Sequence, residues 1–234
     1  MGSIAIADEN TLLVERTFSG PMRHSIEIFP SVRDLLAQVH ATPDDLKHVY
    51  VSGGPGSFTG LRIAVAIAKA MHLANAVRIV AVDTLDVIAA NVPAINGAPE
   101  IIAPILDAKR NRFFAAVYER QLGLGTDLPV TAGSALHAAQ PGWVKILPDT
   151  IITAEQILHQ FTGHGRTLGI LGDGLLLHGD RFKADGTRIM DQVYWSPIAA
   201  NVYRLGLQKA LLGQFEDPLR LAPFYLMPPE VTLH

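Results

Sequence analysis

A glycine-rich turn that opens directly into a helix of small residues constrains this chain most, and it spans residues 51–74. The β-branched and aromatic residues at 49–51 predict a buried strand before the turn. Three glycines and a proline at 53–56 permit backbone angles that are closed to other residues and stiffen the turn. The pattern therefore predicts a strand, a tight turn and a helix in direct succession.

Alanine and glycine recur every four residues on two faces of the helix after the turn. One face carries Gly60, Ala64 and Ala68, and the other carries Ala66, Ala70 and Ala74. Small side chains at this spacing allow a second backbone to approach, so the helix is predicted to pack tightly against something large. Ser57 or Thr59 is expected to cap it. Arg62 lies in the first turn, where the helix dipole disfavours a cation, which predicts either a specific partner or solvent exposure for its side chain.

The turn matches neither standard phosphate-binding pattern. A P-loop requires a lysine directly after its last glycine, whereas Leu61 comes after Gly60 here. The dinucleotide fingerprint G-x-G-x-x-G is also not met, because Gly60 comes one residue too late after Gly56. A structural strand-turn-helix role is therefore favoured over phosphate binding, although any helix N-terminus attracts anions.

Composition excludes several classes of function. The 234-residue chain has a formal net charge of −3 and no tract rich in lysine or arginine, so tight autonomous binding to nucleic acid is not expected. The absence of cysteine removes disulfides, thiolate metal sites and cysteine nucleophiles. No apolar run approaches the length of about 18 residues that a membrane helix needs, and no signal peptide is recognisable. We therefore expect a cytoplasmic protein.

The pattern of elements predicts an α/β chain in two lobes, 1–100 and 101–234, divided within residues 92–100. In the first lobe, strands are predicted at 4–7, 12–18, 49–51 and 78–82, and helices at 25–39, from 42, from the turn to about 74, and at 84–90. In the second lobe, strands are predicted at 101–106, 113–118 and 168–171, helices at 153–161 and 196–212, an extended segment at 224–226, and mostly loop over 121–149. The helix at 196–212 is expected to pack back on the first lobe.

The segment G-P-G-S-F-T-G-L-R at 54–62 resembles the signature of the TsaB (YeaZ) family, the non-catalytic subunit of the bacterial machinery that makes threonylcarbamoyladenosine in tRNA. Shorter matches occur in the family's order along nearly the whole chain. They are H-S with a later proline at 24–30, V-D-T-L-D at 82–86, L-D-A-K-R at 106–110 and P-F-Y-L at 223–226. The resemblance implies an actin-like (ASKHA) two-lobe fold of mixed sheets with flanking helices.

Two departures from the family pattern accompany this resemblance. The family begins with a strand resembling I-L-A-I-D-T-S, whereas residues 2–6 resemble the segment that comes after that strand, so the first strand is expected to be missing. After the segment at 107–110 the family carries Glu-Val-Tyr, where this chain carries Arg-Phe-Phe at 112–114. A role that rests on that glutamate is therefore not expected.

The resemblance also implies that this chain is not an enzyme itself. The catalytic relative TsaD holds its metal with two histidines in a pattern like N-H-L-E-G-H, and the equivalent stretch here places Thr84 and Ile88 at those positions. Neither a hydroxyl nor an alkyl group replaces a pair of imidazoles as transition-metal ligands. We therefore expect no catalytic residue, no metal and no cofactor, with ATP only in the wider complex or in a weak site between subunits.

The interface implied by the resemblance is formed by the glycine turn, the helix after it and the helix that begins near residue 25. The residues expected on it are Gly56, Ser57, Phe58, Thr59, Gly60, Arg62, Ala64, Ala68, Met71, His24 and Ile28. The partners implied are TsaD in a heterodimer, the TsaE ATPase in the wider complex, and a second copy of the chain when TsaD is absent. Contact with tRNA is expected to be indirect, and no contact with a membrane is expected.

The alternative is an independent actin-like enzyme, either a nucleotide-dependent phosphotransferase or a peptidase of the glycoprotease type. Asp107 and Asp173 are carboxylates that such an enzyme could use, although a turn or an ion pair is the commoner role for each. A peptidase needs metal ligands or a nucleophile with a base, and Ser57 is expected to be a helix cap rather than a nucleophile. A third hypothesis is an interaction module without a role in tRNA modification.

Overall fold

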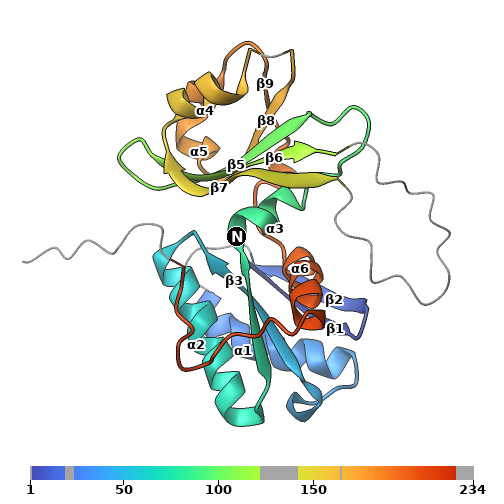
Figure 1. Cartoon of the computed structure of the whole chain (residues 1–234). Helices are drawn as coiled ribbons and strands as arrows, with labels where there is room; N and C mark the ends of the chain where they lie inside the picture. The colour runs from blue at the N-terminus through green and yellow to red at the C-terminus, as the bar shows by residue number, and fades with distance from the viewer. Residues whose placement is uncertain (1, 19–23, 122–141, 164, 225–234) are drawn as a thin grey trace, which may run out of the picture.

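The computed structural model describes residues 2–18, 24–121, 142–163 and 165–224. They form two lobes that lie one above the other in Figure 1, and the short helix α3 (Thr84–Ala89) lies between them. The predicted α/β class, with mixed sheets and flanking helices, is confirmed. None of the described helices is both long enough and apolar enough to cross a lipid bilayer.

The first lobe contains two sheets of two strands. β1 (Gly2–Asp8) pairs antiparallel with β2 (Thr11–Phe18), and β3 (His48–Gly54) pairs parallel with β4 (Arg78–Asp83). Among the described residues these two sheets share no ladder of hydrogen bonds. The helices of this part of the chain are α1 (His24–Gln38), the short 3₁₀ helix η1 (Pro43–Asp45) and α2 (Phe58–Asn75). A further helix, α6 (Ala199–Leu211), comes from the far end of the sequence and packs against β1, β3 and β4.

Alternation of side chains along β3 separates the two helices that cover it. Val51 lies in a core cluster with Val65 and Ala68 of α2. The neighbouring side chain of Tyr50 points to the other face, where its ring lies against Gly206 of α6. Figure 1 accordingly shows α2 and α6 on opposite sides of β3. The first lobe is therefore layered as helix, sheet and helix.

Replacement of Gly206 by alanine is expected to destabilise the protein, although alanine ordinarily favours a helix. A Cβ atom at this position would lie 2.3 Å from Cδ1 of Tyr50, which is too close for a ring held by the sheet. We expect Gly206→Ala to lower the free energy of unfolding by about 1–3 kcal/mol in urea denaturation. The matched control is Gly60→Ala, whose added Cβ would meet nothing closer than 3.6 Å. Equal stabilities of the two variants would contradict this packing.

The second lobe is built on a mixed five-stranded sheet in the order β7-β6-β5-β8-β9. Its strands are β5 (Ile101–Asp107), β6 (Phe113–Arg120), β7 (Trp143–Ile152), β8 (Leu168–Leu171) and β9 (Thr187–Ile189). β6 is antiparallel to both β5 and β7, whereas β8 is parallel to β5 and to β9. The helices are α4 (Ala154–Phe161), α5 (Leu175–His178), η3 (Gly179–Phe182) and η4 (Gln192–Tyr194).

The central strand β5 is buried on both faces, as its continuous apolar sequence predicts. Ile101 and Ile105 point into a core shared with α4 and η3. Ile102 and Leu106 point the other way, into a core that contains Leu85 and other residues of α3. The second core cluster therefore joins α3 to the sheet of the second lobe and holds this helix at the junction of the two lobes.

One prediction for the second lobe is wrong, because residues 143–149 belong to β7 and not to a loop. The strand carries Pro148, and exposed side chains alternate with part-buried ones along its first half. It lies at the edge of the sheet, the position in which a strand tolerates proline. Because this segment contains proline and polar residues, its sequence does not show the pattern typical of a strand. Residues 122–141 and 225–226, which also carried predictions, lie outside the described residues.

The chain beyond α6 returns along β4. The backbone N–H of Glu216 donates to the carbonyl of Ile79 at 2.8 Å, and Leu221 is buried in the core below α2. The ring of Phe215 stacks on His48 at 5.4 Å between centroids, and the guanidinium of Arg78 lies 4.1 Å from the centre of the Phe215 ring. Residues 215–221 therefore pack on the first lobe, and Leu221 is part of its core.

His48 makes the stability of this packing depend on pH. Burial, followed by the charge of Arg78, lowers the pKa of His48 from its ordinary value of 6.5, and its Nε2 atom is buried without a hydrogen-bond partner. The native state therefore binds fewer protons than the unfolded state just below pH 6.5, so stability is lost as the pH falls through this range. We expect the difference in unfolding free energy between the wild type and His48→Phe to change between about pH 7.5 and about pH 5.5. A pH-independent difference would contradict this role.

Candidate functional site

The glycine turn is built to admit the backbone of Phe224. Gly54 has φ of 127°, in the region that favours glycine, and a Cβ atom there would lie 2.5 Å from the carbonyl oxygen of Phe224. The backbone N–H of Phe224 donates to the carbonyl of Gly53 at 2.7 Å. The close backbone approach that a phosphate would need is thus made by the chain itself at this part of the turn, which favours the structural role.

Ser57 caps α2, as predicted, by accepting a hydrogen bond from the backbone N–H of Gly60 at 3.4 Å. The cation in the first turn has a local explanation as well. The guanidinium of Arg62 lies 3.8 Å from the centre of the Phe58 ring, and both residues are exposed. A cation above an aromatic face is attracted by the ring's electron density, which offsets the unfavourable helix dipole. Arg62 and Phe58 therefore form one exposed unit at the start of the helix.

α2 has one face in the core and one face in solvent. Leu61, Val65 and Ala68 are buried against β3 and β4. The opposite side, here named the outer face of α2, comprises Phe58, Arg62, Ala66, Ala70, Leu73 and Ala74, all of them exposed. Leu73 is 83% exposed and Phe58 is 39% exposed, so both add apolar surface to this face. Apart from Arg62, the outer face is therefore apolar, with small residues at its middle and larger side chains at its two ends.

The predicted interface residues fall into different environments. Ser57, Phe58, Thr59, Gly60 and Arg62 are exposed, whereas Gly56, Ala64, Met71 and Ile28 are part-buried. The assignment of Ala68 to the interface is wrong, because its side chain is fully buried between Val51, Ile79 and Leu221. The side chain of His24 lies outside the described residues, although its backbone begins α1. The role of the remaining residues at an interface stays a prediction.

Thr84 and Ile88, which stand where the resemblance to TsaD would require metal-binding histidines, have structural roles here. Thr84 is buried, and its hydroxyl lies 2.6 Å from the hydroxyl of Ser52. Ile88 is fully buried in the core that joins α3 to the second lobe. A hydroxyl already engaged and an alkyl group cannot act as a pair of imidazole ligands. These two positions therefore hold α3 in place.

Asp107, the carboxylate of the alternative enzyme hypothesis, stabilises a turn. It accepts hydrogen bonds from the backbone N–H of Lys109 at 2.8 Å and from its Nζ at 2.7 Å. Burial opposes ionisation of Asp107, but these hydrogen bonds and the lysine charge hold its pKa below the usual range. Lys109 and the two residues after it have positive φ, so the carboxylate braces a strained turn. The pKa of Asp173 is shifted in the opposite direction, because burial of this carboxyl raises it.

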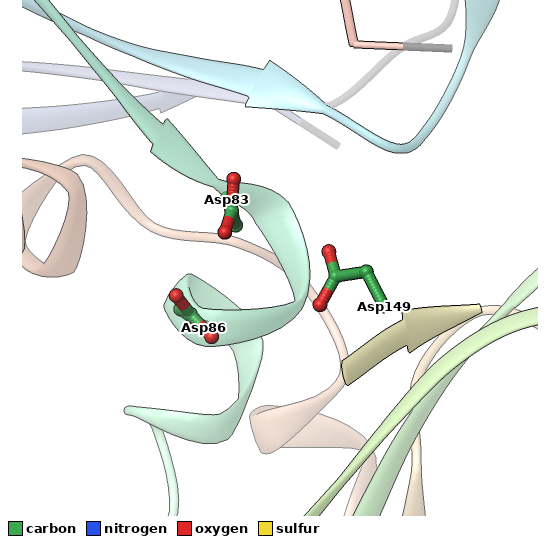
Figure 2. Close-up of side chains that lie close together, drawn as sticks. All are labelled: Asp83, Asp86 and Asp149. Carbon is green, nitrogen blue, oxygen red and sulfur yellow. The ribbon is translucent and has the colours of Figure 1, made fainter. Parts of the chain in front are cut away.

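A cluster of charged side chains lies where the two lobes meet. Asp83, at the end of β4, and Asp86 of α3 face Asp149 of β7, and one oxygen of each lies within 4.8 Å of the others (Figure 2). Lys145 of β7 places its Nζ 2.6 Å from Oδ1 of Asp86 and 2.7 Å from Oδ1 of Asp149. The Tyr118 hydroxyl donates to Oδ1 of Asp86 at 2.5 Å. The cluster therefore joins the lobes through charge.

Electrostatics within the cluster favour the charged lysine. Burial opposes the charge on Lys145, but hydrogen bonds to Asp149 and Asp86 raise its pKa. Burial also raises the pKa of Asp149, against the opposing effect of Lys145. Sequence reasoning missed this cluster because Lys145 and Asp149 were predicted to lie in a loop. A lysine and an aspartate four residues apart were the one visible signal.

Two mixed α/β lobes with helices on both faces of β3 and with α3 at their junction define an actin-like two-lobed protein. Solved structures support this class. YeaZ from Pseudomonas aeruginosa superposes with a TM-score of 0.74 over 96% of this chain and 93% of that one, at 20% identity. A second structure, of a protein with similarity to the peptidase YeaZ from the same organism, gives a TM-score of 0.75 over 96% and 94% at 20% identity.

Sequence comparison narrows the class to a family. The family of tRNA N6-adenosine threonylcarbamoyltransferase, TsaD, matches residues 21–139, just over half of the chain. The tRNA threonylcarbamoyladenosine biosynthesis protein TsaB of Bacillus subtilis strain 168 is 36% identical over 121 residues, 52% of each chain, and that of Escherichia coli K12 is 34% identical over 100 residues, 43% of each. The chain belongs to the TsaB (YeaZ) family, which is related to TsaD. It spans about half the length of the curated relatives it matches.

Proposed function

We propose that this protein is a non-catalytic scaffold subunit that binds TsaD in the biosynthesis of N6-threonylcarbamoyladenosine in tRNA. Curated relatives carry the name of this pathway, and the matched family is that of the transferase itself. In this role the chain positions or activates TsaD, and TsaE joins the wider complex. tRNA is contacted through the partner, and the protein acts in the cytoplasm. ATP belongs to the complex or to a site between subunits.

The outer face of α2 is the observation that carries this proposal. Three exposed alanines at a spacing of four residues, Ala66, Ala70 and Ala74, leave the helix backbone accessible to close approach by another helix. The exposed side chains of Phe58 and Leu73 extend the apolar surface at the two ends. Contiguous exposed apolar surface commonly marks a protein–protein contact. On α1, Phe29 is 55% exposed and supplies further apolar surface for the same partner.

The residues of the described cores support a role without catalysis. Thr84 and Ile88 are packed into the interior, and Asp107 is engaged by Lys109. The surface depression beside Lys183 is open to solvent, whereas a substrate site is ordinarily a concave pocket that buries most of its ligand. A catalytic site for the pathway is therefore proposed to lie on the partner.

Co-expression with the TsaD of the same organism tests the proposal. We expect the two chains to elute together as a heterodimer in size-exclusion chromatography and to remain together at about 0.15 M salt, because an apolar interface is little affected by screening. In the absence of TsaD we expect the same face to form a homodimer in sedimentation at micromolar concentration. Separate elution of the two chains at every tested salt concentration would contradict the proposal.

An independent actin-like enzyme is the second candidate, and one observation favours it. Asp107 is the last residue of β5 and Asp173 comes two residues after β8, so both lie at the carboxyl ends of neighbouring parallel strands, the edge at which α/β proteins commonly bind ligands. ATP turnover by the purified chain, lost in Asp173→Asn, would support this candidate. The proposed scaffold role predicts no ATP turnover above that of the Asp173→Asn variant.

A further inference from the structure

The Asp83–Asp86–Asp149 cluster has more negative charge than its lysine neutralises. Three carboxylates surround the single ammonium of Lys145, so the ionised cluster carries a formal charge of −2. Lys145 makes short contacts to Asp86 and Asp149 but lies 3.8 Å from Asp83. Like charges this close repel strongly unless a further positive charge lies among them.

One oxygen in the cluster has no partner. The side chain of Asp149 is only 8% exposed, and its Oδ1 atom binds Lys145, whereas its Oδ2 atom is buried and accepts no hydrogen bond. A buried acceptor without a donor costs roughly 1–3 kcal/mol, and more when it is charged. Figure 2 shows the carboxylate of Asp149 directed toward those of Asp83 and Asp86. The orphaned oxygen therefore faces the two other carboxylates.

The chemistry and the access of the cluster favour a hard cation. All three potential ligands are carboxylates, which suit Mg²⁺, Mn²⁺ and Ca²⁺ rather than metals that prefer nitrogen or sulfur. The side chain of Asp83 is 48% exposed, so a hydrated ion can enter from its side and keep several waters. Lys145 already occupies part of the space between Asp86 and Asp149, so it competes with any bound cation.

We propose that Asp83, Asp86 and Asp149 bind one divalent cation of the Mg²⁺, Mn²⁺ and Ca²⁺ class between the two lobes, with Lys145 as an internal competitor that keeps the affinity low. The ion supplies the missing partner of Oδ2 of Asp149 and links α3, from the first lobe, to β7 of the second. The occupied site therefore holds the lobes together more firmly than the lysine alone. This inference does not depend on the proposed partner.

Titration of the full chain with Mn²⁺, followed by the electron paramagnetic resonance signal of the free ion, tests the site. We expect one ion per chain with a Kd of about 1 mM, as is usual for weak carboxylate sites. Asp149→Asn removes a negative ligand but keeps an acceptor for Lys145, and it is expected to weaken binding by at least about tenfold. The matched control is Asp185→Asn, an exposed carboxylate outside the cluster, which is expected to leave binding unchanged.

Removal of the competing charge of Lys145 is expected to strengthen the binding of Mn²⁺. Lys145→Met keeps a long unbranched side chain and removes its charge, so we expect Mn²⁺ to bind at least about tenfold more tightly than in the wild type. If this variant folds only in the presence of Mn²⁺, a rise of its Tm with Mn²⁺ concentration reports the same site. The absence of Mn²⁺ binding in the wild type, or equal binding by the wild type and Asp149→Asn, would overturn the proposal.

Discussion

Replacement of Ala66 by tryptophan is expected to weaken the association with TsaD by at least about a hundredfold, which corresponds to about 2.8 kcal/mol. Ala66 lies in the middle of the outer face of α2, where its methyl group is exposed and permits close approach of a partner helix. An indole at this point holds the two backbones apart and breaks the packing around it. Affinity is measured by titration of labelled TsaD with each variant.

Two comparisons separate an effect on the interface from an effect on the fold. Exposed substitutions ordinarily change the free energy of unfolding by less than about 0.5 kcal/mol, so Ala66→Trp is expected to keep the wild-type Tm. The matched control is Ala184→Trp, an equally large change at an exposed alanine of the second lobe, and it is expected to bind TsaD normally. Unchanged affinity of Ala66→Trp would place the interface elsewhere.

Replacement of Ala68, two residues further along, is expected to act on stability instead. Its side chain has no exposed surface and packs among Val51, Val65, Ile79 and Leu221. Overpacking of a filled core costs about 1–3 kcal/mol and occasionally more, and the change from a methyl group to an indole is among the largest possible. We expect Ala68→Trp to lower the free energy of unfolding by about 3 kcal/mol or more.

Ala66→Trp serves as the partner variant for this second prediction, because the same substitution is made on the same helix. Chemical denaturation followed by circular dichroism measures both proteins. A stable Ala68→Trp protein would show that α2 is rotated relative to the described core. Loss of TsaD binding by Ala68→Trp alone would carry no information on the interface, because an unfolded chain binds nothing specifically.

The features that were predictable from the sequence are those set by neighbouring residues. The strand, turn and helix at 48–75 result from β-branched residues, glycines and the cap Ser57. α4 begins at a capping box in which Thr153 and Gln156 exchange hydrogen bonds, and this start was predicted. Local preferences fix these elements because each is stabilised largely by contacts within a few residues.

The features that escaped prediction depend on residues far apart in the chain. β7 forms because β6 offers a partner strand, although Pro148 argues locally against a strand. The face of α2 that holds Ala68 is buried partly by Leu221, so periodicity alone could not decide which row of small residues faces solvent. The carboxylates of Asp83 and Asp149 meet only because α3 packs on the second lobe's sheet. Long-range contacts of this kind have no local signal.

The most direct test of the proposed scaffold role is the transfer of labelled threonylcarbamoyl groups to tRNA by purified TsaD and TsaE. We predict that TsaD and TsaE modify tRNA when the wild-type chain is added, that they do so far less without it, and that Ala66→Trp fails to substitute for it at equal concentration. Equal modification with and without the chain would contradict the proposed scaffold role.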